Sequence, residues 1–143
     1  MMDIELLKNL VDYGVIALLV FMSFISVWFF FERLFFYKAI EVQTFKNKKA
    51  LEIALTKHLS VIGTIASNAP YIGLLGTVLA IMLTFITMST GEIEATKIMA
   101  SLALALKATA VGLVVAIISQ IFYNILARFA EVIESRYDEI TEV

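Results

Sequence analysis

Residues 68–78 read N-A-P-Y-I-G-L-L-G-T-V and lie inside an uncharged stretch that runs from Leu59 to Thr90. About 20 apolar residues in a helix are enough to cross the hydrocarbon core of a bilayer. This stretch exceeds that length, so as a helix rising 1.5 Å per residue it would extend beyond the membrane. We therefore expect a long transmembrane helix here.

Two further stretches have the length and composition of membrane spans. Tyr13–Phe31 carries no charge, and the stretch that begins at Ile98 is interrupted only by Lys107 before it reaches Arg128. The turn between the second and third stretches is short, which predicts a long antiparallel hairpin that extends into the cytoplasm. The chain is thus expected to be an all-α integral membrane protein with three transmembrane helices in a single domain, residues 1–143. The expected boundaries are a first span at about 12–36, a cytoplasmic loop at 37–60, a second span at about 61–89, a periplasmic turn at 90–96, a third span at about 97–128 and a cytoplasmic tail at 129–143.

The composition excludes several other classes of protein. The 143 residues are 61% hydrophobic and only 17% charged, whereas a soluble domain carries about 25% charged residues. The chain has no cysteine and one histidine, so we expect no metal site, no cofactor and no thiol chemistry. The net charge is -2 without a basic tract, which argues against a nucleic-acid partner. No catalytic motif is present, and we expect no enzymatic activity.

The distribution of lysine and arginine predicts the orientation. Six basic residues lie in the segment from Glu32 to Lys57, whereas the N-terminus and the hairpin turn each hold one lysine and more than one acid. Because basic loops stay in the cytoplasm, the N-terminus is expected outside and the C-terminus inside. The segment Ala50–His58 is amphipathic and is expected to continue into the second helix. Lysines of this loop could touch anionic membrane lipids or an acidic partner, although a simple solvated loop is the favoured interpretation.

Small residues recur every three or four positions on the second and third helices. In lipid, small residues allow two helix backbones to approach closely. Packing of the hairpin against itself explains one such stripe, while two stripes are also compatible with an oligomer or a lumen. Proline in the second helix removes a backbone hydrogen bond and is expected to kink it. The residues assigned to packing are Gly73, Gly76, Ala108, Gly112 and Ala116, and the kink is assigned to Pro70.

Lys107 is the only charge in the third span. Counted from the start of its own apolar stretch, it lies near the middle of the membrane, where a lysine costs about 2.5–3.5 kcal/mol on insertion scales. No span carries an acid between its ends, so its counter-charge is expected on another chain or in a hydrated lumen.

Three short sequences together resemble one family of bacterial membrane proteins. They are N-A-P-Y-I-G-L-L-G-T-V at 68–78, A-T-A-V-G-L at 108–113 and Y-N-I-L-A-R at 123–128. In order and spacing they resemble the ExbB/TolQ/MotA proton-channel motors of the inner membrane, most closely the ExbB branch. The resemblance implies a pentamer whose second and third helices surround a lumen. That lumen would hold the helices of ExbD, a single-span partner with a transmembrane aspartate, and ion flow would drive a TonB-like protein for uptake across the outer membrane.

The resemblance also implies roles for single residues. Thr77 and Thr109 match two threonines that face the lumen in the family. Leu104 stands where ExbB and TolQ proteins typically have a glutamate, so a proton route through that glutamate is not available here. We therefore expect Lys107, one turn later, to face the lumen and pair with the partner's aspartate. The alternatives are a TolQ-type role in envelope constriction, or a membrane channel or scaffold that works without a partner.

Overall fold

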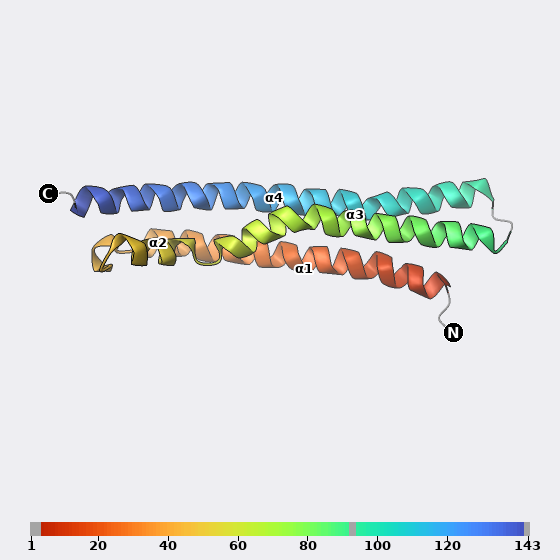
Figure 1. Cartoon of the computed structure of the whole chain (residues 1–143), viewed down its shortest axis with the longest axis horizontal. Helices are drawn as coiled ribbons and strands as arrows, with labels where there is room; N and C mark the ends of the chain where they lie inside the picture. The colour runs from red at the N-terminus through yellow and green to blue at the C-terminus, as the bar shows by residue number, and fades with distance from the viewer. Residues whose placement is uncertain (1–3, 92–93, 142–143) are drawn as a thin grey trace.

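The computed structural model describes residues 4–91 and 94–141, and within these ranges every regular element is a helix (Figure 1). Three of the helices are long and apolar enough to cross a membrane, as the sequence predicts. This confirms an all-helical chain suited to a multi-pass membrane protein. The elements are α1 (Ile4–Ala39), the short 3-10 helix η1 (Val42–Thr44), α2 (Lys48–Thr56), α3 (Leu59–Ser89) and α4 (Ala95–Thr141).

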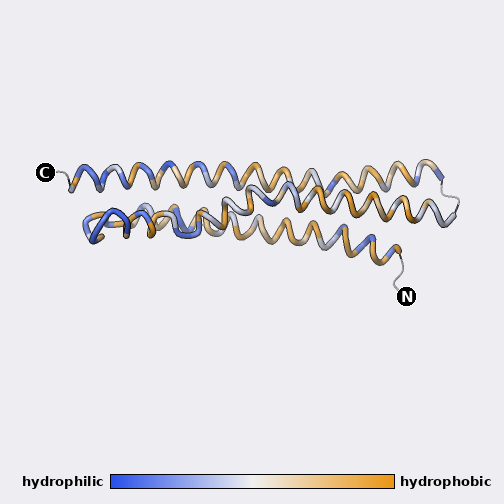
Figure 2. Tube along the Cα trace, viewed as in Figure 1, coloured by the Kyte–Doolittle hydropathy of each residue, from blue (hydrophilic) through white to orange (hydrophobic). Residues whose placement is uncertain are grey.

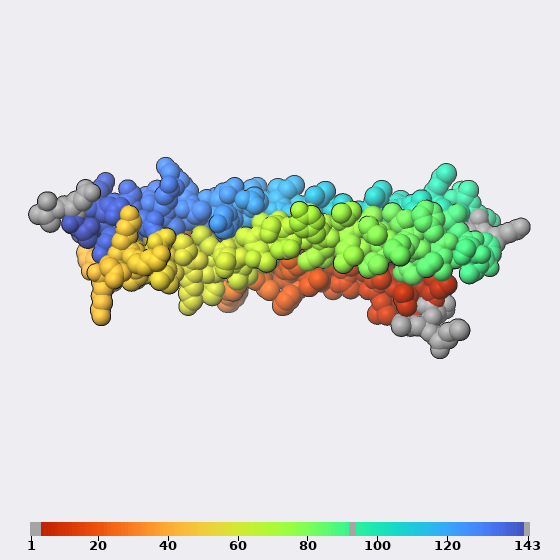
Figure 3. All heavy atoms as spheres, viewed as in Figure 1, coloured from red at the N-terminus to blue at the C-terminus, as the bar shows by residue number. Residues whose placement is uncertain are grey.

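The three long helices lie side by side in an elongated rod (Figures 1 and 3). α3 and α4 run in opposite directions and share the largest contact, and α1 packs along both of them. Two side-chain hydrogen bonds fix the register of α1 on α4. Lys8 donates to Ser101 at 2.8 Å, and the hydroxyls of Ser26 and Ser119 lie 2.8 Å apart, so both pairs are separated by 93 residues. α1 therefore runs parallel to α4, and its uncharged stretch 13–31 lies level with about 106–124.

The chain does not continue from α2 into α3 as one helix, although the sequence led us to expect that. His58 separates them with a left-handed backbone (φ 70°), and its ring stacks on Phe29 at 4.2 Å. In a continuous helix the carbonyls of residues 54 and 55 would accept hydrogen bonds from the backbone of residues 58 and 59. Here the guanidinium of Arg33 donates to the carbonyl of residue 54 at 2.7 Å, and the Tyr37 hydroxyl donates to that of residue 55. Two side chains of α1 thus occupy the carbonyls that a longer α2 would need.

Arg33 and Tyr37 are themselves held in place by neighbouring groups. Arg33 is 2% exposed, pairs with Glu32 at 2.6 Å, and places its guanidinium 4.3 Å from the centre of the Phe36 ring. Burial raises the pKa of Tyr37 to about 12, so its hydroxyl keeps its proton and remains a donor at every physiological pH. The corner between α2 and α3 is therefore determined by α1.

α4 remains helical to Thr141, well beyond residue 128, where the third span was expected to end. Its last turns pack against α2, because Leu51 and Leu55 of α2 are buried in one cluster with Ile133 and Tyr137. The sequence shows where the apolar stretch ends, near Arg128. The helix continues past this residue because its contact with α2 stabilises the last turns.

The contact between α2 and α4 is expected to depend on pH through Glu134. Burial raises the pKa of this carboxyl, Glu52 raises it further, Lys48 lowers it, and Asp138 and Glu131 raise it slightly. A carboxyl whose folded pKa is raised destabilises the folded contact at neutral pH, and this penalty disappears as the pH falls through the raised value. Glu134→Gln should therefore raise the thermal unfolding midpoint at about pH 7 but not at about pH 4. An equal gain at both pH values would contradict this cause.

Candidate functional site

The backbones of α3 and α4 touch where Gly73 meets Gly112. A Cβ atom built on Gly73 would lie 2.5 Å from the carbonyl oxygen of Ala108, and one on Gly112 would lie 2.6 Å from that of Ala69. A Cβ built on either glycine would also lie 3.1 Å from the Cα of the other glycine. Real Cβ atoms do not approach backbone atoms this closely, so only glycine allows this crossing. Hydrophobic attraction between helices is weak in lipid, and such close approach is a main source of their association.

The other residues assigned to packing lie around this crossing. A Cβ on Gly76 would meet both Ala108 of α4 and Val15 of α1 at 3.1 Å or less, so Gly76 lies where the three helices meet. Ala116 is buried in a cluster with Leu19 of α1. Pro70 lies within α3, which remains one helix and bends in this region (Figure 1).

Thr77 and Thr109 form a hydrogen bond to each other between α3 and α4. The Thr77 hydroxyl also lies 2.8 Å from the carbonyl oxygen of Ala105, and only 5% of Thr77 is exposed. Within one chain Thr77 therefore faces α4 rather than a free surface. Thr109 is half-buried at the edge of the same seam.

Lys107 is exposed, and its depth differs from the sequence estimate. With the 93-residue offset between α1 and α4, it lies level with Gly14, next to the outer end of the uncharged stretch of α1. Counting along α4 alone placed it near the middle of the span, because the apolar stretch of α4 begins well outside that of α1. Asp12, which is half-buried on α1, lies level with about Ala105. The sequence analysis missed Asp12 as a neighbour because only the register between helices brings it to this level.

The structure brings Thr77 and Thr109 together but does not bring Lys107 to them. At 100° per residue, Lys107 and Thr109 point in directions about 160° apart around the axis of α4. Leu104, which is 61% exposed, lies about 60° from Lys107 on the same side of the helix. On a single α4 helix, Lys107 and Thr109 therefore lie on nearly opposite sides and face different surroundings.

A group of exposed polar side chains lies along the later part of the uncharged stretch of α1, and the sequence analysis did not single it out. We call it the polar patch. Figure 2 shows hydrophilic colours where α3 begins and hydrophobic colours toward its other end. Gln120 donates to Asn124 at 3.2 Å, and both are exposed. The polar patch consists of Ser60, Thr64, Ser67 and Asn68 on α3 and Gln120 and Asn124 on α4.

The depth of the polar patch follows from the contact between α3 and α4. A Cβ on Gly63 of α3 would lie 3.2 Å from the Tyr123 ring of α4, and the 93-residue offset places Tyr123 level with Phe30. Ser60 therefore lies just past the end of the uncharged stretch of α1, and the other members of the patch lie within the second half of that stretch.

The amide groups of the polar patch favour an environment other than lipid. The hydroxyls of Thr64 and Ser67 donate to carbonyls one turn earlier in α3, so they are satisfied within the helix. Among the described residues the amides of Gln120 and Asn124 bond only to each other, and polar groups of this kind at membrane depth face a protein interior or a water-filled cavity. The patch has a sequence signal, since Ser60, Thr64 and Ser67 are spaced four and three residues apart. Its extension to α4 becomes visible only when the two helices lie side by side. Among the described residues no group of three or more His, Cys, Asp or Glu could hold a metal ion.

Comparison with known proteins agrees with this architecture. Residues 29–139 match the model of the MotA/TolQ/ExbB proton channel family. The chain is 53% identical to the biopolymer transport protein ExbB of Aquifex aeolicus, over 87% of this chain and 84% of that protein. It is 46% identical to the ExbB of Helicobacter pylori, over 94% of both chains, so a chain this short is shared with that relative.

TolQ proteins are more distant relatives. The Tol-Pal system protein TolQ of Haemophilus influenzae is 41% identical over 63% of this chain and only 42% of its own length. The matched family consists of membrane transport components rather than enzymes, and the match extends over the last part of α1, all of α2 and α3 and nearly all of α4. The chain therefore belongs to the MotA/TolQ/ExbB proton channel family, and within it the sequence is ExbB-like.

Proposed function

We propose that this chain is the ExbB-type subunit of an inner-membrane motor that couples the proton-motive force to uptake across the outer membrane. Its partners would be an ExbD-like single-span protein with a transmembrane aspartate and a TonB-like protein that receives the work. The polar patch is the observation that carries the proposal. Its exposed amide groups, above all Gln120 and Asn124 on α4, leave polar atoms unbonded at membrane depth, so they favour water or a protein partner.

A ring of copies would provide both. In a pentamer with α1 outside, the α3–α4 pairs would line a lumen, and the polar patches would form its inner, hydrated half. The outer half would be apolar, because exposed Val78, Met82 and Phe85 follow on α3 and exposed Leu106 and Leu113 lie on α4. Such a lumen would hold an apolar partner helix tightly at one end and admit water at the other. The first loop and the C-terminus would lie in the cytoplasm, since the segment from Glu32 to Lys57 carries six of the 11 basic residues.

Lys107 would supply a fixed positive charge separate from the threonine pair. It is the only charged residue of α4 between Lys97 and Arg128, and no carboxylate lies within 4 Å of it among the described residues. We propose that the partner's aspartate meets this charge during ion transfer, to one side of the polar patch, because Lys107 points about 100° from Asn124 around the axis of α4. Leu104, at the position of the usual glutamate, cannot perform that role.

Native mass spectrometry of the chain, co-expressed with an ExbD-like single-span protein from the same genome, tests the proposal. We expect a pentamer that contains two partner chains. Thr64→Leu with Asn124→Leu should weaken partner retention while the helix content remains unchanged, because the change removes polar groups from the patch alone. A matched control is Phe21→Leu with Phe24→Leu on the exposed face of α1, which should retain the partner.

Two results would contradict the proposal. A homo-oligomer that never retains a single-span partner would favour the partner-free channel or scaffold. Equal partner retention in the patch variant and in the control would show that the polar patch does not face the lumen. A TolQ-type role, which the more distant TolQ relatives make the second candidate, would be recognised by a defect in envelope constriction rather than in uptake.

A further inference from the structure

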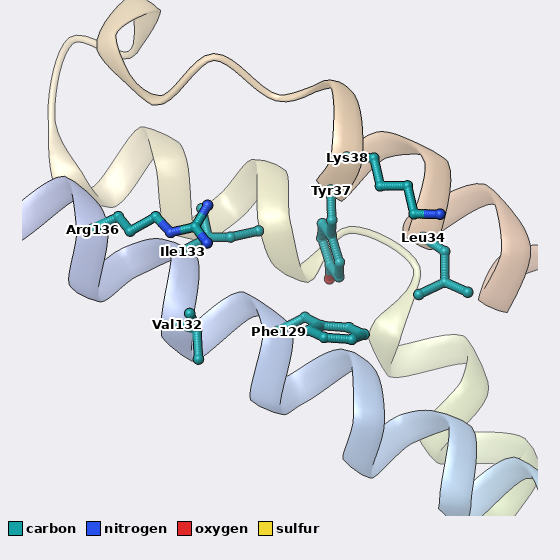
Figure 4. A pocket seen from close by; sticks show the side chains of 7 residues that line it. All are labelled: Leu34, Tyr37, Lys38, Phe129, Val132, Ile133 and Arg136. Carbon is teal, nitrogen blue, oxygen red and sulfur yellow. The ribbon is translucent and has the colours of Figure 1, made fainter.

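A cavity of about 320 Å³ lies between α1 and α4, outside the polar patch and the glycine crossing (Figure 4). It opens near the cytoplasmic end of α1, where Lys38 is five residues, or about 7 Å of helix, beyond Arg33. The headgroup layer on each side of a bilayer is about 5–8 Å thick, so this cavity lies close to the inner headgroups. Its walls are formed by Leu34, Tyr37 and Lys38 of α1 and by Phe129, Val132, Ile133 and Arg136 of α4.

The walls combine two cations with an apolar surface. Lys38 and Arg136 extend from different helices on either side of the Tyr37 and Phe129 rings (Figure 4). Phe129 is 45% exposed and Val132 is 38% exposed, although both lie past the end of the third apolar stretch. Exposed apolar side chains at this depth are stabilised if a hydrocarbon chain covers them.

Within the part of the chain that the structure describes, the two cations of the cavity have no carboxylate partner. Four other basic residues at this end of the molecule each lie within 4.0 Å of a carboxylate oxygen: Arg33, Lys48, Lys49 and Arg128. Lys38 and Arg136 make no such pair with any described residue, and none of the seven lining residues is acidic. The cavity therefore carries a local positive charge that no carboxylate of the described residues balances within 4.0 Å, and an external anion fits it.

We propose that this cavity binds one anionic phospholipid of the inner leaflet. The lipid headgroup lies between the two cations, where the Lys38 ammonium and the Arg136 guanidinium can turn toward it from either side, and an acyl chain covers Leu34, Phe129 and Val132. Basic pockets between helices on the cytoplasmic side are known to suit such headgroups. Because the cavity has one wall on each helix, a bound lipid would tie the end of α1 to the extension of α4. The inference rests on the membrane location and on the proposed orientation, and not on the proposed motor function.

The test compares lipid retention by the purified, assembled protein in native mass spectrometry, with phosphatidylglycerol and phosphatidylcholine as the probes. The wild type should retain phosphatidylglycerol in preference to phosphatidylcholine. Lys38→Gln with Arg136→Gln should weaken that retention about 30-fold, the equivalent of about 1 kcal/mol for each cation. The control, Lys46→Gln with Lys57→Gln, removes the same charge from exposed positions outside the cavity and should change retention by less than about threefold.

Three outcomes would overturn the proposal. The first is equal retention by the cavity variant and the control, which would reduce the effect to general surface charge. The second is displacement of the lipid by inorganic phosphate or by chain-free glycerophosphoglycerol at similar concentrations, which would identify a soluble anion as the ligand. The third is a second copy of the chain that fills the cavity, seen as loss of the oligomer in the cavity variant with no change in lipid retention by the remaining species.

Discussion

Alanine at Gly73 is expected to lower the free energy of unfolding by about 3 kcal/mol or more. The added Cβ would meet the carbonyl oxygen of Ala108 at 2.5 Å, and this atom belongs to the backbone of α4. No side-chain rotation can relieve such a contact, so the two helices have to separate along the crossing. Separation would also break the hydrogen bond from Thr77 to the carbonyl of Ala105, which is 2.8 Å long in the intact pair. Gly112→Ala should have a similar effect for the same reason.

Gly14→Ala is the matched control for this prediction. A Cβ on Gly14 has no heavy atom within 4 Å, so the substitution adds the same methyl group to a membrane-level helix without a contact. Alanine also favours the helix by about 1 kcal/mol relative to glycine, so this variant should be as stable as the wild type or slightly more stable. The stability of the Gly73→Ala and Gly14→Ala proteins is measured by unfolding in detergent micelles, followed by circular dichroism. If the Gly73 and Gly14 variants unfold alike, the crossing does not stabilise the hairpin.

The sequence predicts best those features that depend on residues close together in the chain. Glycine and alanine spaced four apart mark one face of a helix, so the small-residue stripes could be assigned before any helix was placed. The three apolar helices follow from stretches of uninterrupted hydrophobicity. Neither inference requires knowledge of which residues meet across the bundle.

Features that depend on distant residues could not be predicted. α2 ends at Thr56 because Arg33 and Tyr37, about 20 residues earlier, occupy its last carbonyls. The sequence of Ala50–His58 does not show that side chains of α1 compete for these carbonyls. The segment was therefore predicted to continue into the next helix. The predicted depth of Lys107 was wrong for a similar reason, since that depth is set by the 93-residue offset between α1 and α4. The same offset brings Asp12 close to its level.

The register between α1 and α4 also changes the estimated cost of placing Lys107 in the membrane. A lysine near the outer end of the uncharged stretch can extend its amine toward water, so its insertion costs less than at the centre of the membrane. The cost of the charge is thus a weaker argument for function than its isolation. No carboxylate lies within 4 Å of Lys107 among the described residues, and its direction differs from that of Thr109 by about 160°. A role in ion transfer therefore has to be tested apart from stability.

Lys107→Met is expected to leave the fold intact and to reduce proton-driven uptake about tenfold or more, as the loss of one charge contact worth about 1.4 kcal/mol would. The side chain is exposed and makes no hydrogen bond to other described residues, so its removal leaves no buried group unpaired. Methionine is also apolar, and the variant should insert at least as well as the wild type. Lys107→Arg keeps the charge and should retain most of the uptake, while Leu106→Met controls for a methionine at an exposed neighbouring position. Uptake and unfolding are measured on the same four proteins. Full uptake by the Lys107→Met protein would exclude a charge role, whereas a loss shared with Leu106→Met would assign the effect to packing at this level of α4.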